Sequence, residues 1–214
     1  MNGSTKNHHA ARTGHRLAGA LAGMLLLCAG CDSHPAYYRG DVAAIAEGTP
    51  VAVLPLVNLT KDVNAPDIVM NAVTVELLAT QRFRVIDPGV VEQAMQNERI
   101  RFSDRLPPET LHALAAALGV NYVFVGTVNE YQLVRDSGRD VPAVSFALRM
   151  IACDSGNIVW AATHAKRGDD SETMFTLGRI DTLEELTTVA AREMTSTLLP
   201  ENTRHKAEPG KSTP

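Results

Sequence analysis

The chain has 214 residues, of which 45% are hydrophobic, and its formal net charge is −4. This length suits one domain of ordinary size rather than two full domains with tails, and the apolar fraction excludes a wholly disordered chain. The acidic balance argues against nucleic acid as a partner, and three cysteines are too few for a disulfide scaffold.

The first thirty residues have the features of an export signal. Three basic residues and no acid precede an unbroken apolar run at 17–27. The basic residues are Lys6, Arg12 and Arg16. A transmembrane helix needs about 20 apolar residues, so the run is too short to span a bilayer. We therefore predict a signal peptide over residues 1–30.

The end of that signal resembles the lipobox of bacterial lipoproteins. Residues 27–31 read Leu-Cys-Ala-Gly-Cys, with Cys28 where the pattern usually has leucine. We predict cleavage after residue 30 and lipidation of Cys31, with a plain signal peptide as the alternative. Each buried CH₂ of an acyl chain contributes about 0.8 kcal/mol, so membrane lipid becomes a partner through acylated Cys31. Asp32 resembles an inner-membrane retention signal in some enteric bacteria, but we favour the outer membrane, with the domain facing the periplasm.

Processing changes the charge and the cysteine count. Without residues 1–30 the chain has 184 residues, with 17 basic against 24 acidic side chains, and a formal charge of −7. Cys153 is then left without a cysteine partner. Its apolar neighbours at 150–152 predict that the thiol is buried.

The mature chain divides into three parts. We predict a lipidated linker over 31–50, a domain over 51–200 and a disordered polar tail over 201–214. Tyr37 and Tyr38 in the linker suit either a lipid interface or the edge of the domain.

The first half of the domain alternates strands and helices. The apolar run at 51–56 predicts a strand buried on both faces, and helical spacing of apolar residues follows Pro66. A short strand is expected at 83–86, then a helix begun by Asp87-Pro88 and another begun at Pro107 and ended by Gly119.

The second half is dominated by strands. The expected elements are a strand from 122 to about 133, a turn at 136–140, a strand at 144–150, a turn at 154–157 and a strand at 158–163. Asp181 with Glu184 three residues later predicts a capping box and a last helix. The order β-α-β-α-α-β-β-β-α predicts an α/β three-layer sandwich with a mixed sheet.

No motif for catalysis, cofactor binding or metal binding is present. No histidine pair has metal-ligand spacing, and neither a nucleophile elbow nor a phosphate loop occurs. The acidic cluster at 169–172 suits a helix start better than a cation site, with Asp169 or Ser171 as cap. His164 and His112 are expected to be structural. The sequence therefore predicts a non-enzyme with no catalytic residue, no cofactor and no metal.

Four segments in order resemble the curli-secretion lipoprotein (CsgG-type) superfamily. They are Val-Ala-Val-Leu-Pro-Leu-Val-Asn-Leu-Thr at 51–60, Phe-Arg-Val-Ile-Asp at 83–87, Ala-Leu-Gly-Val-Asn-Tyr-Val-Phe-Val-Gly-Thr-Val at 117–128 and Asp-Ser-Gly-Asn-Ile-Val-Trp at 154–160. The resemblance covers most of 50–198 and implies a three-layer α/β fold. Its members include curli export channels, activators of penicillin-binding proteins and lipoproteins of Pel polysaccharide export.

Two departures distinguish among these members. Curli-type channels insert two long amphipathic hairpins into the membrane, whereas 134–142 and 164–180 are short or charged here. Activators of penicillin-binding proteins have long disordered linkers, and 31–50 is short by comparison. By elimination, the resemblance favours a Pel-type scaffold.

Three hypotheses follow. The first is a homo-oligomeric accessory scaffold for envelope assembly or polymer secretion, and the second is an activator that docks on a cell-wall synthase. The third is an enzyme that uses Asp169, Asp170 and His164, and the missing nucleophile and base argue against it.

Overall fold

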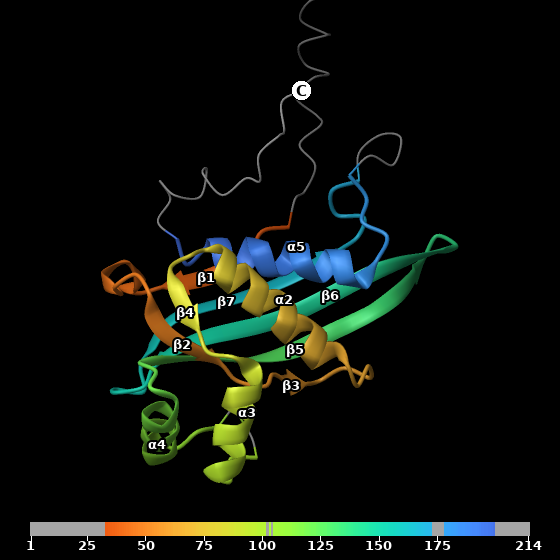
Figure 1. Ribbon diagram of the computed structural model, residues 1–214. Helices are drawn as coiled ribbons and strands as arrows, with labels where there is room; N and C mark the ends of the chain where they lie inside the picture. Colours follow the sequence, from red (N-terminus) through yellow and green to blue (C-terminus); the bar gives the residue numbers. More distant parts are fainter. Residues whose placement is uncertain (1–32, 102, 104, 173–177, 200–214) are drawn as a thin grey trace, which may run out of the picture. The chain divides into compact units, whose positions relative to one another are not determined.

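The computed structural model describes residues 33–199 apart from 102, 104 and 173–177. In this part of the chain a mixed sheet has the strand order β1-β7-β6-β5-β2-β4, with β3 paired to β5 (Figure 1). The strands are β1 (Ala36–Arg39), β2 (Thr49–Val53), β3 (Val57–Asn58), β4 (Phe83–Val85), β5 (Tyr122–Asp136), β6 (Arg139–Ala152) and β7 (Ile158–Arg167). The helices are η1 (Val42–Ala44), α2 (Ala65–Ala79), α3 (Pro88–Asn97), α4 (Pro108–Leu118) and α5 (Leu183–Ser196).

The two ends of the sheet have different connections. β2, β4 and β5 are parallel, and the crossovers between them carry α2 in one case and α3 with α4 in the other. β5, β6 and β7 are antiparallel and are joined by tight turns. Parallel strands need long, usually helical crossovers, whereas antiparallel strands can be joined by short turns. The predicted order, with helices between the first strands and none between the last three, agrees with this arrangement.

Helices cover both faces of the sheet and produce two hydrophobic cores. α2 and α5 pack against one face, where Phe124 of β5, Phe146 of β6 and Trp160 of β7 are fully buried. α3 and α4 pack on the other face, over β2 and the start of β5, and enclose Leu54 and Leu114. The predicted α/β sandwich with a mixed sheet is confirmed.

Burial alternates from residue to residue along β6. Val144, Phe146, Leu148 and Met150 are at most 1% exposed, whereas the residues between them are half-buried. Side chains of a strand alternate between the two faces of the sheet, so the apolar set lies under α5 and the other set lies on the opposite face.

The linker prediction for 31–50 is wrong within the described residues. β1 lies in this segment and adds to the sheet edge as an antiparallel neighbour of β7. After it, Val42 and Ile45 enter the main core at 0% and 8% exposure. The described residues from Ser33 onward therefore belong to the folded unit. The predicted signal at 1–30, the lipidation site Cys31 and the tail at 201–214 lie outside the described residues.

The start of α5 differs from the prediction by one residue. Thr182 rather than Asp181 is the N-cap, and its hydroxyl accepts a hydrogen bond from the Glu185 amide at 3.2 Å. Asp181 instead forms an ion pair with Arg179. The sequence Asp-Thr-Leu-Glu-Glu contains two overlapping capping boxes, and the ion pair leaves the threonine as the cap.

Candidate functional site

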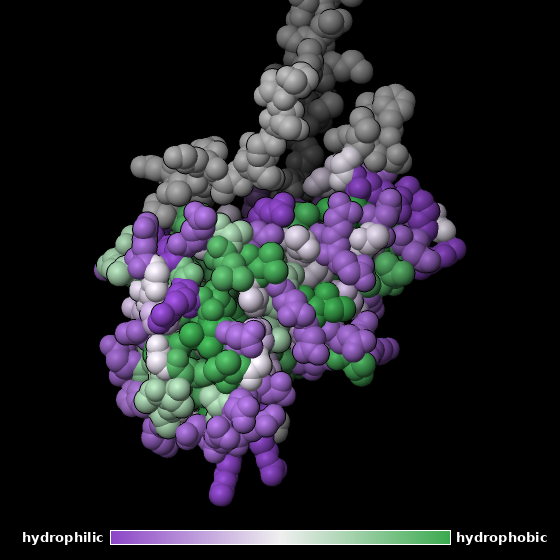
Figure 2. Space-filling view, in the orientation of Figure 1, coloured by the Kyte–Doolittle hydropathy of each residue, from purple (hydrophilic) through white to green (hydrophobic). Residues whose placement is uncertain are grey.

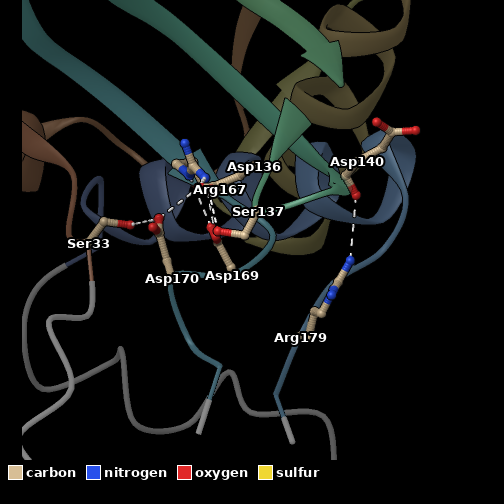
Figure 3. A network of polar contacts seen from close by, with 8 residues as sticks. All are labelled: Ser33, Asp136, Ser137, Asp140, Arg167, Asp169, Asp170 and Arg179. Atoms are coloured by element: carbon tan, nitrogen blue, oxygen red, sulfur yellow. Dashed lines mark hydrogen bonds and ion pairs between the residues drawn. The ribbon is translucent and has the colours of Figure 1, made fainter. Parts of the chain in front are cut away.

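A network of ionic contacts fixes the first described residue to the fold (Figure 3). The Ser33 hydroxyl donates to Oδ2 of Asp170 at 2.8 Å, and the same oxygen accepts the Arg167 amide at 2.8 Å. The Arg167 guanidinium contacts Asp169 through Nε at 3.0 Å and Asp136 through Nη2 at 2.8 Å. We call these five residues the tether network. It connects the N-terminal segment to the end of β7 and to the β5–β6 turn.

The contact between Arg167 and Asp169 shifts the pKa values of both groups in the direction that favours their charged forms. Hydrogen bonding to Arg167 lowers the pKa of Asp169, and the same contact raises the pKa of Arg167. Both groups are therefore charged at neutral pH. Since Asp169 and Asp170 are engaged by Arg167 and Ser33, the acidic cluster at 169–172 serves the fold. The helix predicted to start there falls partly on residues outside the described part.

β1 continues this attachment along the sheet edge. Tyr38 is in register with Ala161, and Arg39 is in register with Trp160 of β7. The Arg39 guanidinium donates to the carbonyl of Leu199 at 2.5 Å, which joins the start of the domain to its last described residue. Tyr37 and Tyr38 are 45% and 57% exposed on this strand, so they lie at the domain edge.

A second charged group joins β7 to α5. Glu193 of α5 contacts Nε2 of His164 at 2.6 Å and Nζ of Lys166 at 2.9 Å. The His164 and Lys166 side chains are only 1% and 2% exposed, and the Glu193 side chain is 30% exposed. Burial alone would raise the pKa of Glu193, but hydrogen bonds from His164 and Lys166 outweigh it and lower the pKa. We call these three residues the Glu193 cluster.

The residues of the enzyme hypothesis have separate partners. His164 pairs with Glu193, whereas Asp169 and Asp170 belong to the tether network. His164 also shares the buried face of β7 with Trp160. These contacts give His164 a structural role.

A hollow of about 460 Å³ lies where α4 meets the β6–β7 turn. Its lining includes His112, Asn121, Cys153 and Asp154, and the ring of His112 is 3.2 Å from the Asp154 carbonyl. Cys153 is 4% exposed, as predicted, and burial together with Asp154 raises its pKa to about 11. The thiol is therefore protonated at neutral pH and is a poor nucleophile.

Residues 33–199, with the gaps given above, contain no group of three or more histidine, cysteine, aspartate or glutamate side chains placed to hold a metal ion. No helix in this same part is long and apolar enough to cross a membrane.

One part of the surface, formed by α2 and the start of α3, is apolar. Val75 and Leu78 of α2 are 60% and 51% exposed, and Val90 at the start of α3 is 54% exposed. Figure 2 shows a continuous apolar area over the C-terminal half of α2 that extends toward α3. We call it the α2 patch. The exposure of these apolar side chains makes this area a candidate binding surface.

Sequence reasoning missed two of the residues that organise these sites. Arg39 lies in a segment without apolar periodicity, and Glu193 contacts residues of β7 that are 27 and 29 positions away. The alternation of Ala162, His164 and Lys166 was the available signal, because it places both polar side chains on the buried face of β7.

The comparisons with known proteins agree on the type of fold. A model of the family described as peptidoglycan-synthase activator LpoB matches residues 39–165, more than half of the chain. Among solved structures, the PelC dodecamer from Paraburkholderia phytofirmans is similar with a TM-score of 0.54 and 20% identity, over 78% of this chain and 96% of that one.

Two other solved structures are similar at lower scores. Lipoprotein GNA1162 from Neisseria meningitidis is 26% identical over 56% of this chain and 82% of that one, with a TM-score of 0.48. The LpoB C-terminal domain from Escherichia coli is 15% identical over 57% of this chain and 85% of that one, with a TM-score of 0.42. No curated protein matches the sequence.

Proposed function

The chain belongs to the LpoB family of peptidoglycan-synthase activators, and on this basis we propose that it is a lipid-anchored, non-enzymatic accessory protein of the cell envelope that activates a cell-wall synthase by docking on it. The family match is the observation that carries the proposal. The lipobox at 27–31 adds the anchor at Cys31 and a position facing the periplasm, with the outer membrane favoured.

The described residues support a binding role over a catalytic one. The buried side chains of His164 and Lys166 are engaged by Glu193, and the half-buried acidic cluster is engaged by Arg167. The remaining feature of note is the α2 patch, an apolar surface of the kind that protein partners cover. We therefore place the synthase contact there.

Glycan polymerisation by a purified bifunctional peptidoglycan synthase of the same organism tests the proposal. The mature chain with Cys31→Ser, which remains soluble, is added to the synthase and its lipid-linked precursor. The expected result is a faster polymerisation rate and direct binding. An unchanged rate together with no binding would sink the proposal.

Leu78→Asp locates the docking surface. A charge in the centre of an apolar interface removes about 1–3 kcal/mol of binding, so affinity for the synthase should fall by about 5- to 150-fold. Leu133→Asp is the matched control, because Leu133 is 55% exposed on β5 and lies outside the patch. Equal effects of both variants would place the contact elsewhere.

A second candidate is a homo-oligomeric scaffold for envelope assembly or polymer export. The two outer strands of the described sheet, β1 and β4, favour it. The exposed Tyr38 lies on β1, and the α2 patch lies beside β4. Open sheet edges with apolar neighbours are surfaces that a second copy can cover. Light scattering of the mature chain separates the two candidates, because a monomer at all attainable concentrations contradicts the scaffold.

A further inference from the structure

The distance between the lipid anchor and the fold is set by covalent geometry. Cys31 and Ser33 are two residues apart, and consecutive Cα atoms are about 3.8 Å apart, so their Cα atoms are separated by at most about 8 Å. Ser33 is already held by Asp170, and β1 begins three residues later. A tether this short cannot let the domain move away from the lipid that carries it.

The point of attachment lies at one end of the sheet. Ser33 joins the tether network, whose Asp136 ends β5 beside the β5–β6 turn. The opposite end of the same strands holds Tyr122, the first residue of β5, and the β6–β7 turn at 154–157. β6 has 14 residues, and at about 3.3 Å per residue the two ends are about 40 Å apart.

We propose that the end of the domain formed by the tether network and the β5–β6 turn lies against the lipid headgroups of the anchoring membrane, with the long strands running away from the bilayer. The premise is the lipid anchor at Cys31 from the proposed function. The occupant of this surface is a lipid bilayer, because the acylated residue is at most two residues from the network.

The charges of this end indicate that the tether, rather than electrostatic attraction, holds it at the membrane. Arg167 is offset by Asp136 and Asp169, Arg135 pairs with Asp140, and Arg179 pairs with Asp181. Arg139 likewise pairs with Glu172, so the described residues of this end present no excess of positive charge to the lipid. The contact should therefore persist when salt screens the surface charges.

Two serines in turns at opposite ends of β6 provide matched probe sites. Ser137 and Ser155 are both exposed, so Ser137→Cys and Ser155→Cys can each carry a fluorophore in a Cys153→Ala background. The acylated protein is reconstituted into phosphatidylethanolamine and phosphatidylglycerol vesicles that contain a spin-labelled headgroup lipid. Spin labels quench a fluorophore only at short range, and the two probe sites are about 40 Å apart along the strands. We therefore expect at least about fivefold more quenching at residue 137 than at residue 155. This difference should not change in high salt.

A linker variant tests the cause of the difference. A flexible Gly/Ser insertion of about 20 residues between Asp32 and Ser33 lets the domain move some 25 Å on average from its anchor, so quenching at residue 137 should fall to the level at residue 155. Equal quenching at both sites without the insertion overturns the proposed orientation. A difference that survives the insertion overturns the role of the short tether.

The outcomes also separate this proposal from the proposed function. Vesicle flotation reports the anchor, and a protein that fails to float contradicts both the lipidation of Cys31 and the membrane contact. A protein that floats without the quenching difference contradicts only the orientation. Activation of the synthase is measured with the soluble Cys31→Ser chain and does not depend on either result.

Discussion

Replacing Glu193 by glutamine should destabilise the domain by about 2 kcal/mol at neutral pH. Removing one partner of a fully buried ion pair costs about 3–5 kcal/mol, because the remaining charge loses its compensation. The effect here is smaller for two reasons. The Glu193 side chain is 30% exposed, and glutamine keeps an oxygen that can accept from Lys166 at the present 2.9 Å.

The same substitution should change the pH dependence of stability. The Glu193 pKa is lowered in the folded state, so its ionisation contributes stability above the ordinary glutamate pKa, and this contribution is lost as the pH falls through the lower folded pKa. The difference between wild type and Glu193→Gln should therefore be largest near pH 7 and shrink below about pH 4.5.

Urea and thermal unfolding of the soluble mature chain measure both effects. A loss of 2 kcal/mol corresponds to a decrease of roughly 4–8 °C in Tm for a domain of this size. Glu184→Gln is the matched control, since Glu184 is an exposed glutamate in the first turn of the same helix, and it should change stability by only a few tenths of a kcal/mol. If both variants lose the same amount, or if the loss is the same at pH 4 and pH 7, then the Glu193 cluster does not stabilise the fold as described.

Three further predictions concern other parts of the chain. Cys31→Ser should move the protein from the membrane to the soluble periplasmic fraction, and unchanged fractionation contradicts lipidation at that residue. Gly126→Ala should destabilise the fold by about 1–3 kcal/mol in urea unfolding, because the added Cβ would lie 2.3 Å from the carbonyl oxygen of Ala147 on β6, and an unaffected midpoint would show that the strands separate easily. Cys153 should react with a thiol reagent at pH 8 only after unfolding, since burial raises its pKa to about 11, and rapid labelling of the native protein would contradict that burial.

The buried elements could be predicted from the sequence because burial leaves a pattern. Val51, Ala52 and Val53 form a continuous apolar run, and they lie in β2 between helices on both faces. Val144 and Phe146 begin an alternation that the structure reproduces in β6. In both cases the contrast between core and solvent determines the residue types.

The edge of the sheet could not be predicted in this way. β1 has three exposed residues of four, so its side chains show no alternation. Its strand conformation comes from pairing with β7, and backbone hydrogen bonds do not select residue types. β7 also continues to Arg167, beyond the predicted end at 163, because the buried Lys166 is compensated by Glu193 on a distant helix. A polar residue that is buried with a distant partner has the same appearance in the sequence as a polar residue in a loop.

The candidate binding surface and the proposed membrane contact lie at different ends of the domain. β2, β4 and β5 are parallel. Phe83 at the start of β4 is in register with Thr49 of β2, and Tyr122 at the start of β5 is in register with Val51 of β2, so β4 and β5 start at the same end of the sheet. α2 runs back from the end of β2 toward the start of β4, so Val75 and Leu78 near its C-terminus lie far from the β5–β6 turn. The α2 patch therefore lies toward the end of the domain away from the proposed lipid contact.

Under the proposed function, this arrangement constrains how the domain can reach a synthase. A folded unit of some 170 residues is about 40 Å across, and a tether of two residues adds less than 10 Å to its reach. With Cys31 acylated as proposed, the two residues between the lipid and Ser33 therefore cannot provide the long reach that the disordered linker of other activators implies. A synthase anchored in the same membrane can contact the α2 patch directly, whereas one in the opposite membrane has to extend its own domain to within about 50 Å of the anchor.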